Sequence, residues 1–323
     1  MEYRKMPGTS LKLSVLSLGT MQFGGQTSEA DSLKIMDYAF ERGINVFDTA
    51  DTYLGGEGEK VVGKGLKGRR EKIILATKVG QKIGEDQGLC RRHILAAVDN
   101  SLKRLGTDYI DIYYLHTPDY ETTLEETMET MNTLVKAGKT RYIGVSNFAS
   151  WQMADILSIC NMRGYVPVVV CQNVYNLITR GVEAELIPFL QTHKMGMFAY
   201  NPIAGGLLTG KHNPGTPEQG TRFSDTHKQS ASYSGRYWTD QNFAVVEKLK
   251  KIAGEHGMNI MQLAMKWCAQ QKSVSSVLVG VSRLSQLEQH IPILEGDPLD
   301  KQVLEKCDEV WRTLTGNRFA YNR

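Results

Sequence analysis

The feature that most constrains the fold of this chain is a regular alternation of short apolar runs with amphipathic segments. Six apolar runs end in polar residues at intervals of roughly 26 to 38 positions: Asp48, Lys78, His116, Ser146, Gln172 and Tyr200. One strand, one helix and the loops that join them to the next strand occupy about 30 residues or more. The runs are almost continuously apolar, which is typical of parallel strands buried on both faces.

Two further runs, one before and one after this series, complete a set of eight. The set comprises 13–19, 44–48, 72–78, 109–116, 141–147, 168–173, 196–201 and 276–280. Eight repeats of strand and helix predict an α/β fold of the (β/α)8 or TIM-barrel type, whose functional site lies at the carboxyl ends of the strands. We expect a single domain over residues 1–323, with an N-terminal strand or hairpin that caps the barrel.

A doubly wound sheet is the competing topology, and it usually carries a glycine-rich turn after its first strand. Here the first run is followed by GTMQFGG, which lacks that pattern. The segment GGEGEKVVGKG is glycine-rich, but it follows the second run and its spacing differs from the dinucleotide-binding fingerprint. A turn and close helix packing explain its glycines.

The interval between Tyr200 and the last run is too long for one strand and one helix. It holds a polar segment at about 211–238, which we interpret as a loop insertion before the eighth strand and not as a linker between domains. Its glycines, prolines and small polar residues are expected to bury little apolar surface. Elsewhere, Ser28 predicts the start of a helix, and Gly106 and Gly138 predict helix ends.

Charge and cysteine usage narrow the class of protein. The net charge of +3 is too small to indicate a nucleic-acid partner. The five cysteines are scattered and lack metal-ligand spacing, so we expect reduced thiols and no metal site. The N-terminal MEYRKMPGTS lacks the apolar core of a signal peptide, and no apolar run approaches about 18 residues. A soluble cytoplasmic protein is expected, without membrane association or an evident obligatory protein partner.

Four residues are expected to converge on one rim of the barrel. Asp48, Lys78 and His116 end three consecutive strands, and Tyr53 lies in the loop after the first of these. A tyrosine has a pKa of about 10, and a nearby ammonium lowers it. A carboxylate keeps that ammonium charged, and a histidine hydrogen-bonds to the same oxygen. Such a group suits a general acid that faces a carbonyl oxygen.

Each of these residues also has a purely structural interpretation. Asp48 and Lys78 could form a structural ion pair. Tyr53 could be a half-buried surface aromatic, and His116 could cap a loop. Asp51 is better explained by a local turn or a helix start. The convergence of four such residues on one rim favours a catalytic role for the group.

Seven blocks of sequence occur in order along the strands and loops: FDTADTY, ATK, YYLHTPD, GKTRYIGVSNF, QNVYN, YNPIAGGLLTGK and VSSVLVGVSRLSQLEQH. In content, order and spacing they resemble the aldo-keto reductase superfamily, over nearly the whole chain. The resemblance implies an NAD(P)H-dependent oxidoreductase that acts on CH–OH groups. It further implies that Tyr53 is the proton donor, and that Asp48, Lys78 and His116 complete a catalytic tetrad.

The same resemblance places a nicotinamide cofactor. Ser146, Asn147 and Gln172 resemble contacts to the nicotinamide carboxamide, and Tyr200 resembles the aromatic that stacks on its ring. Other implied positions lie beside the pyrophosphate, at the adenosine phosphate or in a covering loop at about 211–238: Pro202, Leu207, Lys211, Arg222, Gly280, Ser282, Arg283, Gln286 and Gln289. A guanidinium such as that of Arg283 favours the 2′-phosphate of NADP, so NADPH is the expected cofactor.

Two positions depart from the family pattern. His290 stands where the family often has asparagine, so the adenine end is expected to be held differently. Gly58 replaces a small hydroxyl residue, which should affect packing more than catalysis.

The implied function is reduction of a small aldehyde or ketone to an alcohol by hydride transfer, with Tyr53 as general acid. One alternative is a cofactor-binding regulatory subunit that resembles a channel β subunit. Another is a sugar or polyol dehydrogenase that runs in the oxidising direction.

Phe23, Phe148 and Tyr175 are expected to line an aromatic bowl above the nicotinamide. The C-terminal GNRFAYNR either folds over the barrel mouth or forms a packed or frayed tail.

Overall fold

The computed structural model of the chain describes residues 1–83, 87–225 and 230–315. The C-terminal GNRFAYNR and residues 226–229 of the insertion lie outside the described residues, so the two interpretations of the tail stay open. Within the described part, no helix is long and apolar enough to cross a membrane.

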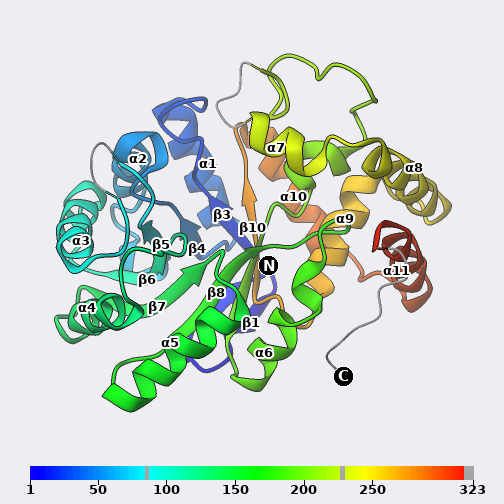
Figure 1. Ribbon diagram of the computed structural model, residues 1–323. Coiled ribbons are helices and arrows are strands. Elements are labelled where there is room, and N and C mark those ends of the chain that lie inside the picture. Colours follow the sequence, from blue (N-terminus) through cyan, green and yellow to red (C-terminus); the bar gives the residue numbers. More distant parts are fainter. Residues whose placement is uncertain (84–86, 226–229, 316–323) are drawn as a thin grey trace.

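A closed parallel barrel forms the centre of the molecule (Figure 1). Its strands are hydrogen-bonded in the order β10-β3-β4-β5-β6-β7-β8-β9. Their bounds are β3 (Leu16–Gly19), β4 (Val46–Asp48), β5 (Ile74–Val79), β6 (Ile110–Leu115), β7 (Thr140–Ser146), β8 (Val168–Val174), β9 (Gly196–Tyr200) and β10 (Ser276–Gly280). Because β10 pairs with both β9 and β3, the sheet has no free edge. The predicted TIM barrel is confirmed.

Helices surround the barrel on its outer side (Figure 1). They are α1 (Glu29–Glu41), α2 (Glu57–Gly65), α3 (Arg91–Leu105), α4 (Leu124–Lys136), α5 (Ser150–Arg163), α6 (Leu186–Thr192), α7 (Ser230–Tyr237), α8 (Asp240–Glu255), α9 (Ile260–Gln270), α10 (Leu284–Glu295) and α11 (Lys301–Thr315). Short 3₁₀ segments are η1 (Tyr53–Gly56), η2 (Arg70–Lys72), η3 (Gly181–Glu183) and η4 (Ala204–Thr209). The predicted N-cap is confirmed, because the Ser28 side chain accepts a hydrogen bond from the Asp31 amide. The predicted helix end at Gly106 is also confirmed, with a φ of 63° directly after α3.

The first apolar run contains two strands and not one. Its start forms β2 (Lys12–Ser14), which pairs antiparallel with β1 (Tyr3–Lys5). Its end forms β3 of the barrel, after a break at Val15. Met6 and Leu13 of the hairpin pack into an apolar cluster inside the barrel, at the end where the strands begin. The run looks continuous in sequence because both of its strands are buried.

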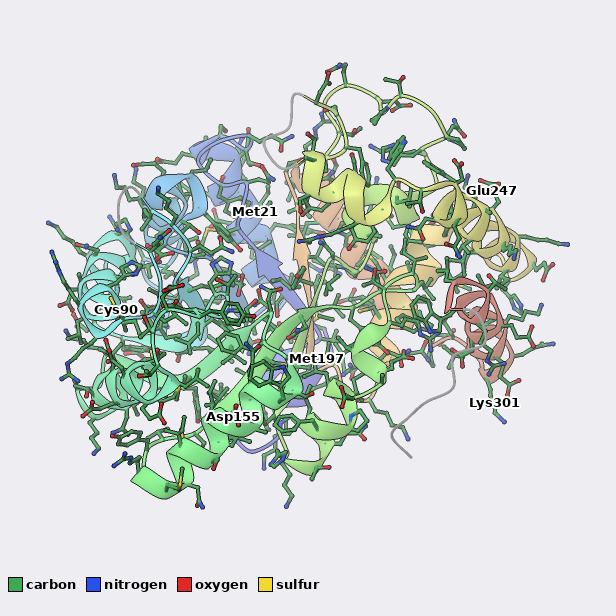
Figure 2. All side chains as sticks on the ribbon, viewed as in Figure 1. Met21, Cys90, Asp155, Met197, Glu247 and Lys301 are labelled. Carbon is green, nitrogen blue, oxygen red and sulfur yellow. The ribbon has the colours of Figure 1, made fainter. Side chains whose placement is uncertain are left out.

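The core has two layers, one inside the barrel and one between the sheet and the helices. Met197 and Phe198 are neighbours on β9 and point to opposite faces of the sheet, so they belong to different layers. Figure 2 shows Met197 near the centre of the molecule, while Glu247 and Lys301 lie at its periphery. Because apolar side chains fill both layers, polar side chains on the strands lie mainly at the strand ends.

The insertion buries more apolar surface than its composition predicts. Tyr233 and Tyr237 lie four positions apart on α7, and both are buried. Phe223 is 2% exposed and packs against the His212 ring, with centroids 5.1 Å apart. The expectation of little burial was therefore wrong. Aromatic residues at helical spacing give α7 one apolar face, and that face lies toward the barrel.

Candidate active site

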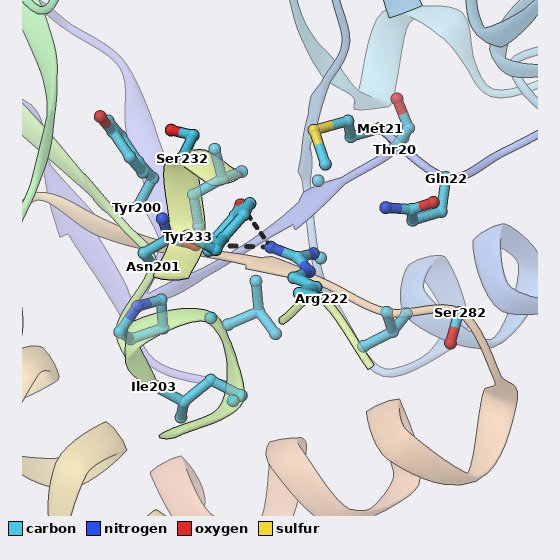
Figure 3. Close-up of a pocket in the computed structure, with 18 of the residues that line it drawn as sticks. Thr20, Met21, Gln22, Tyr200, Asn201, Ile203, Arg222, Ser232, Tyr233 and Ser282 are labelled. Atoms are coloured by element: carbon cyan, nitrogen blue, oxygen red, sulfur yellow. Dashed lines mark hydrogen bonds between the residues drawn. The ribbon is translucent and has the colours of Figure 1, made fainter. Parts of the chain in front are cut away.

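A pocket of about 750 Å³ opens at the carboxyl ends of the barrel strands. Figure 3 shows part of it, with Tyr200, Arg222 and Ser282 around the space. The predicted site residues that line it are Asp48, Tyr53, His116, Ser146, Asn147, Gln172, Tyr200, Pro202, Lys211, Arg222, Gly280, Ser282 and Gln286. The barrel thus brings together side chains that are far apart in the sequence.

Lys78 is the centre of the predicted tetrad, although it is fully buried beneath the pocket. Its Nζ donates to Asp48 Oδ1 and, at 2.7 Å, to the carbonyl oxygen of Thr49. A third, longer contact of 3.3 Å joins Nζ to the Tyr53 hydroxyl. The second oxygen of Asp48 accepts a hydrogen bond of 2.8 Å from Gln172. Asp48 on β4, which is itself held by Gln172 on β8, therefore fixes the Lys78 ammonium beneath the pocket.

The loop after β4 turns Tyr53 back over Lys78. The Tyr53 amide donates to the Ala50 carbonyl at 3.2 Å, which closes a tight turn. The next residue, Leu54, has a φ of 53°, a conformation that is costly for a bulky side chain. A Cβ on Gly58 would lie 3.4 Å from Tyr53, so α2 packs closely against the tyrosine. A larger residue at position 58 would therefore contact Tyr53, and the expectation that this departure affects packing more than catalysis stays a prediction.

Burial and charge act in opposite directions on the pKa values of this group. Burial raises the pKa of Tyr53 above its ordinary 10.0, and the Lys78 ammonium opposes that rise only in part. The net shift is opposite to the one expected from charge alone. Burial is the largest effect on Lys78 and would lower its pKa, but Asp48 and Tyr53 together outweigh burial and raise that pKa. Burial, with a smaller effect from Lys78, holds the pKa of His116 well below 6.5.

These directions fix the protonation states at neutral pH. Tyr53 carries its proton, Lys78 is charged and His116 is neutral. The His116 ring meets the Tyr53 ring edge-on, with centroids 6.0 Å apart. The group can therefore donate a proton from Tyr53 and a hydrogen bond from a neutral imidazole toward the same region of the pocket.

The residues expected at the nicotinamide form a connected network of hydrogen bonds. Asn147 has a φ of 63°, and its amide nitrogen donates to the carbonyl of His116 and to the Ser146 hydroxyl, at 3.1 Å each. Its amide oxygen accepts from the Tyr200 hydroxyl at 2.8 Å. The Ser146 hydroxyl donates to the Gln172 carbonyl. The ends of β6, β7, β8 and β9 are thereby held in one fixed arrangement.

Arg222 links the insertion to the barrel. Its Nη1 donates to the Tyr233 hydroxyl at 2.7 Å and lies 3.5 Å from the Asn201 side-chain oxygen (Figure 3). The guanidinium also lies beside β10, because a Cβ on Gly280 would be 3.6 Å from Nη2. A positive charge is thus placed at the wall of the pocket.

Some predicted residues do not line the pocket. Leu207 is 1% exposed and packs in the core. Arg283 and Gln289 are absent from the described pocket wall. Arg283 is the N-cap of α10, and its amide donates to the Gln286 side chain at 3.2 Å. His290 is buried, and burial lowers its pKa to about 4.

The expected aromatic bowl is wrong. Phe23, Phe148 and Tyr175 are all buried in the core and do not line the pocket. The wall includes Ile203, Gly205, Gly206 and Arg236, which lie in the segments expected at the cofactor phosphates. It also includes residues that the sequence reasoning did not single out, which lie on loops or beside predicted positions: Gly19, Thr20, Met21, Gln22, Gln26, Gln81, Thr117, Asn201, Thr209, His212, Gly220, Thr221, Ser232, Tyr233, Leu278, Val279 and Val281. Proximity to a strand end in sequence could have indicated several of them.

Comparison with known proteins agrees with this geometry. The model of the Aldo/keto reductase family matches residues 15–312, which include all the barrel strands. The chain belongs to the aldo/keto reductase family. Relatives of this aldo/keto reductase include proteins whose names point to different roles.

The chain is 34% identical over 319 residues to the "Probable voltage-gated potassium channel subunit beta" of Arabidopsis thaliana, covering 96% of each chain. It is 33% identical over 327 residues to "Aflatoxin B1 aldehyde reductase member 2" of Rattus norvegicus, covering 96% of this chain and 88% of the relative. The Homo sapiens protein of the same name is 34% identical over 313 residues, with 92% and 86% covered.

Proposed function

We propose that this aldo/keto reductase is an NADPH-dependent oxidoreductase that reduces aldehydes or ketones to alcohols. The observation that carries the proposal is the position of Lys78 Nζ, which donates to Asp48 and lies 3.3 Å from the Tyr53 hydroxyl. Tyr53 and His116 both line the pocket above it. A protonated hydroxyl beside a neutral imidazole is a donor set suited to the oxygen of a carbonyl group.

In this proposal the chain supplies the proton and the orientation of the substrate. Tyr53 gives its proton to the carbonyl oxygen, and the Lys78 ammonium stabilises the phenolate that remains. His116 donates a hydrogen bond to the same oxygen and thereby orients the carbonyl. Asp48 keeps Lys78 charged and in place. A dihydronicotinamide, when bound, supplies the hydride for the carbonyl carbon.

The residues around the pocket fit a dinucleotide. Gly205 and Gly206 have φ values of 68° and 112°, which favour glycine, and both line the pocket, so that a pyrophosphate can approach this turn without meeting a side chain of either residue. Lys211 and Arg222 add positive charge at the pocket wall. Ser282 lies just before α10, where the helix N-terminus favours a phosphate. We propose that these residues hold NADPH, with Ser146, Asn147, Gln172 and Tyr200 around the nicotinamide.

The test of this proposal is consumption of NADPH or NADH by the full-length protein with a panel of aldehydes and ketones. We expect saturable turnover and a preference for NADPH of about tenfold or more, the magnitude of a charge-assisted hydrogen bond to the 2′-phosphate. Arg283 is the proposed donor of that bond, so Arg283→Ala should weaken the binding of NADPH and leave the affinity for NADH unchanged. Binding of NADPH without turnover of any carbonyl compound would contradict the reductase.

A second candidate is a cofactor-binding regulatory subunit of a membrane channel. It is favoured by the name of the Arabidopsis thaliana relative, which this chain matches over 96% of its length. The same assay separates the two functions, because a regulatory subunit needs to bind the dinucleotide but not to turn it over. Tight NADPH binding, negligible turnover and co-purification with a channel subunit would favour this candidate.

We further propose that the insertion at about 211–238 covers the bound cofactor. Arg222 already lies beside Asn201 and Gly280 of the barrel, and the buried Tyr233 and Tyr237 anchor α7. The part between Asn213 and Glu218 is mostly exposed, so a dinucleotide could bury it. Hydrogen exchange of this part should slow when NADPH binds, and reopening could then limit cofactor release. Unchanged exchange here, beside slower exchange near Tyr200, would show that the insertion stays aside.

A further inference from the structure

A second cavity, of about 220 Å³, lies outside the active-site pocket. One face of α3 forms most of its wall, with residues at helical spacing. Asp51 and Ile83, from the loops after β4 and β5, complete it. The residues that line it are Asp51, Ile83, His93, Ala96, Ala97, Asn100 and Arg104. Cys90, labelled in Figure 2, directly precedes α3 and marks this side of the barrel.

Polar atoms in and around this cavity lack partners although they are buried. Asp51 is 1% exposed, and neither of its carboxyl oxygens has a partner that meets the distance and angle of a hydrogen bond among the described residues, although the Thr52 amide is close enough to lower its pKa. The same holds for His93 Nε2 and for the hydroxyl of Tyr113, whose pKa is raised well above 10.0 by burial and then by the nearby Asp51. Buried polar atoms are normally paired, because leaving them bare costs free energy. These atoms therefore indicate a ligand.

The carboxylate of Glu59, which lies near Asp51, already has a partner on each of its two oxygens. Glu59 Oε1 accepts from the Thr77 hydroxyl at 2.6 Å, and Oε2 lies 2.6 Å from the Arg104 guanidinium. Glu59 and Arg104 thus neutralise each other, which leaves the carboxyl of Asp51 as the unmatched charge. Lys78, on β5, compensates it only in part and from a distance, because its Nζ is held by Asp48, Thr49 and Tyr53.

His93 Nε2 is a second acceptor in the cavity, and the hydrogen bond at the other ring nitrogen shows why. His93 Nδ1 lies 2.9 Å from the Gly88 carbonyl oxygen, which can only accept, so Nδ1 carries the proton. In the neutral ring, Nε2 then accepts. A ligand here must bring N–H donors for Asp51 and His93, a positive charge for Asp51, and an apolar part for Ala96, Ala97 and Ile83.

We propose that this cavity is a binding site for a small alkylammonium cation, with its ammonium group on Asp51 and His93 Nε2 and its alkyl group against Ala96 and Ala97. The volume agrees with such a ligand, since an apolar cavity of about 150 Å³ accommodates benzene. The site is open to solvent at exposed Ala96 and Asn100. Its occupancy does not depend on the proposed reductase activity.

The charge of Asp51 makes the binding dependent on pH. Burial, then the Glu59 carboxylate, raises the pKa of Asp51 to about 7, against the lowering effects of the Thr52 amide, Arg104 and Lys78. Asp51 is therefore ionised above pH 7 and protonated below it. Since the cation needs the carboxylate, its affinity should fall about tenfold for each pH unit below that pKa.

The test is calorimetric titration of the full-length protein with propylammonium chloride, above and below pH 7. Tetramethylammonium chloride at the same ionic strength is the comparison, because it has the charge but no N–H donor. We expect saturable propylammonium binding above pH 7 that weakens below it, and much weaker binding of tetramethylammonium. Equal binding of the two cations, or no saturable heat above pH 7, would overturn the proposal and leave ordered water as the content of the cavity.

Three variants locate the site. Asp51→Asn keeps the shape of the side chain and should weaken propylammonium binding at least about tenfold above pH 7. The difference should shrink below pH 7, where the native Asp51 is protonated. Ala96→Leu leaves the polar groups intact and should also abolish binding, by filling the cavity from its exposed side. Asp108→Asn is the matched control, because Asp108 is an exposed carboxylate away from the cavity. Undiminished binding in Asp51→Asn, or in a folded Ala96→Leu, would contradict the site.

Discussion

Replacement of Tyr53 by phenylalanine is expected to lower kcat for carbonyl reduction by about 10²–10⁴-fold, the usual contribution of a positioned general acid. The variant removes the hydroxyl that lies 3.3 Å from Lys78 Nζ and keeps the ring that packs against His116. Fold and NADPH affinity should therefore change little. Steady-state kinetics and a cofactor titration measure the two effects separately.

The matched control for this variant is Tyr120→Phe. Tyr120 follows β6 and is 80% exposed, so loss of its hydroxyl should leave kcat unchanged. Near-normal turnover in Tyr53→Phe would show that another group donates the proton. The pH profile gives an independent check. Burial raises the pKa of Tyr53 above 10.0, so its hydroxyl stays protonated at neutral pH. The rate of reduction by the native protein should therefore not fall through loss of this proton until the pH exceeds 10.

Residues at strand ends were the most predictable part of the site. Asp48, Lys78 and His116 are positioned by β4, β5 and the end of β6, whose apolar runs are clear in the sequence. The closed barrel then requires neighbouring strands to end on one rim, as the register from Asp48 to Ala76 and from Lys78 to Tyr114 shows. Periodicity and spacing therefore suffice to bring this group together.

Loop residues were less predictable, because their positions depend on turns and on packing partners far away in sequence. The insertion was expected to bury little, yet Phe223, Tyr233 and Tyr237 are buried. Composition counts glycines and polar residues, whereas burial depends on a few aromatic side chains that share one helix face. The same limit applies to Phe23 and Tyr175, whose aromatic character alone did not distinguish the core from the pocket wall.

The second cavity illustrates a different limit. Asp51 has an obvious local explanation in a turn after β4, and its sequence neighbours do not include α3. The unmatched charge becomes visible once Arg104 is seen to pair with Glu59 and not with Asp51. Whether a buried carboxyl group is paired is a property of the three-dimensional structure, and no spacing rule within FDTADTY determines it.

Replacement of Lys78 by methionine is expected to destabilise the protein by about 3–5 kcal/mol, because removal of one partner of a buried ion pair leaves the other charge uncompensated. Lys78 and Asp48 have side-chain exposures of 0% and 1%, so the remaining carboxylate would be poorly hydrated. Gln172 would be the neutral donor left on Asp48, at 2.8 Å. The free energy of unfolding by denaturant measures the effect.

Two further variants separate buried charge from lost packing in that result. Lys64→Met removes an ammonium 2.7 Å from Glu29, but both side chains are about half exposed, so stability should barely change. Adding Asp48→Asn to Lys78→Met removes the uncompensated carboxylate and should restore much of the lost stability, without restoring turnover. If the double variant is as unstable as Lys78→Met alone, the cost comes from packing around the lysine stem. In that case the Asp48–Lys78 charge pair would not be what holds the floor of the pocket together.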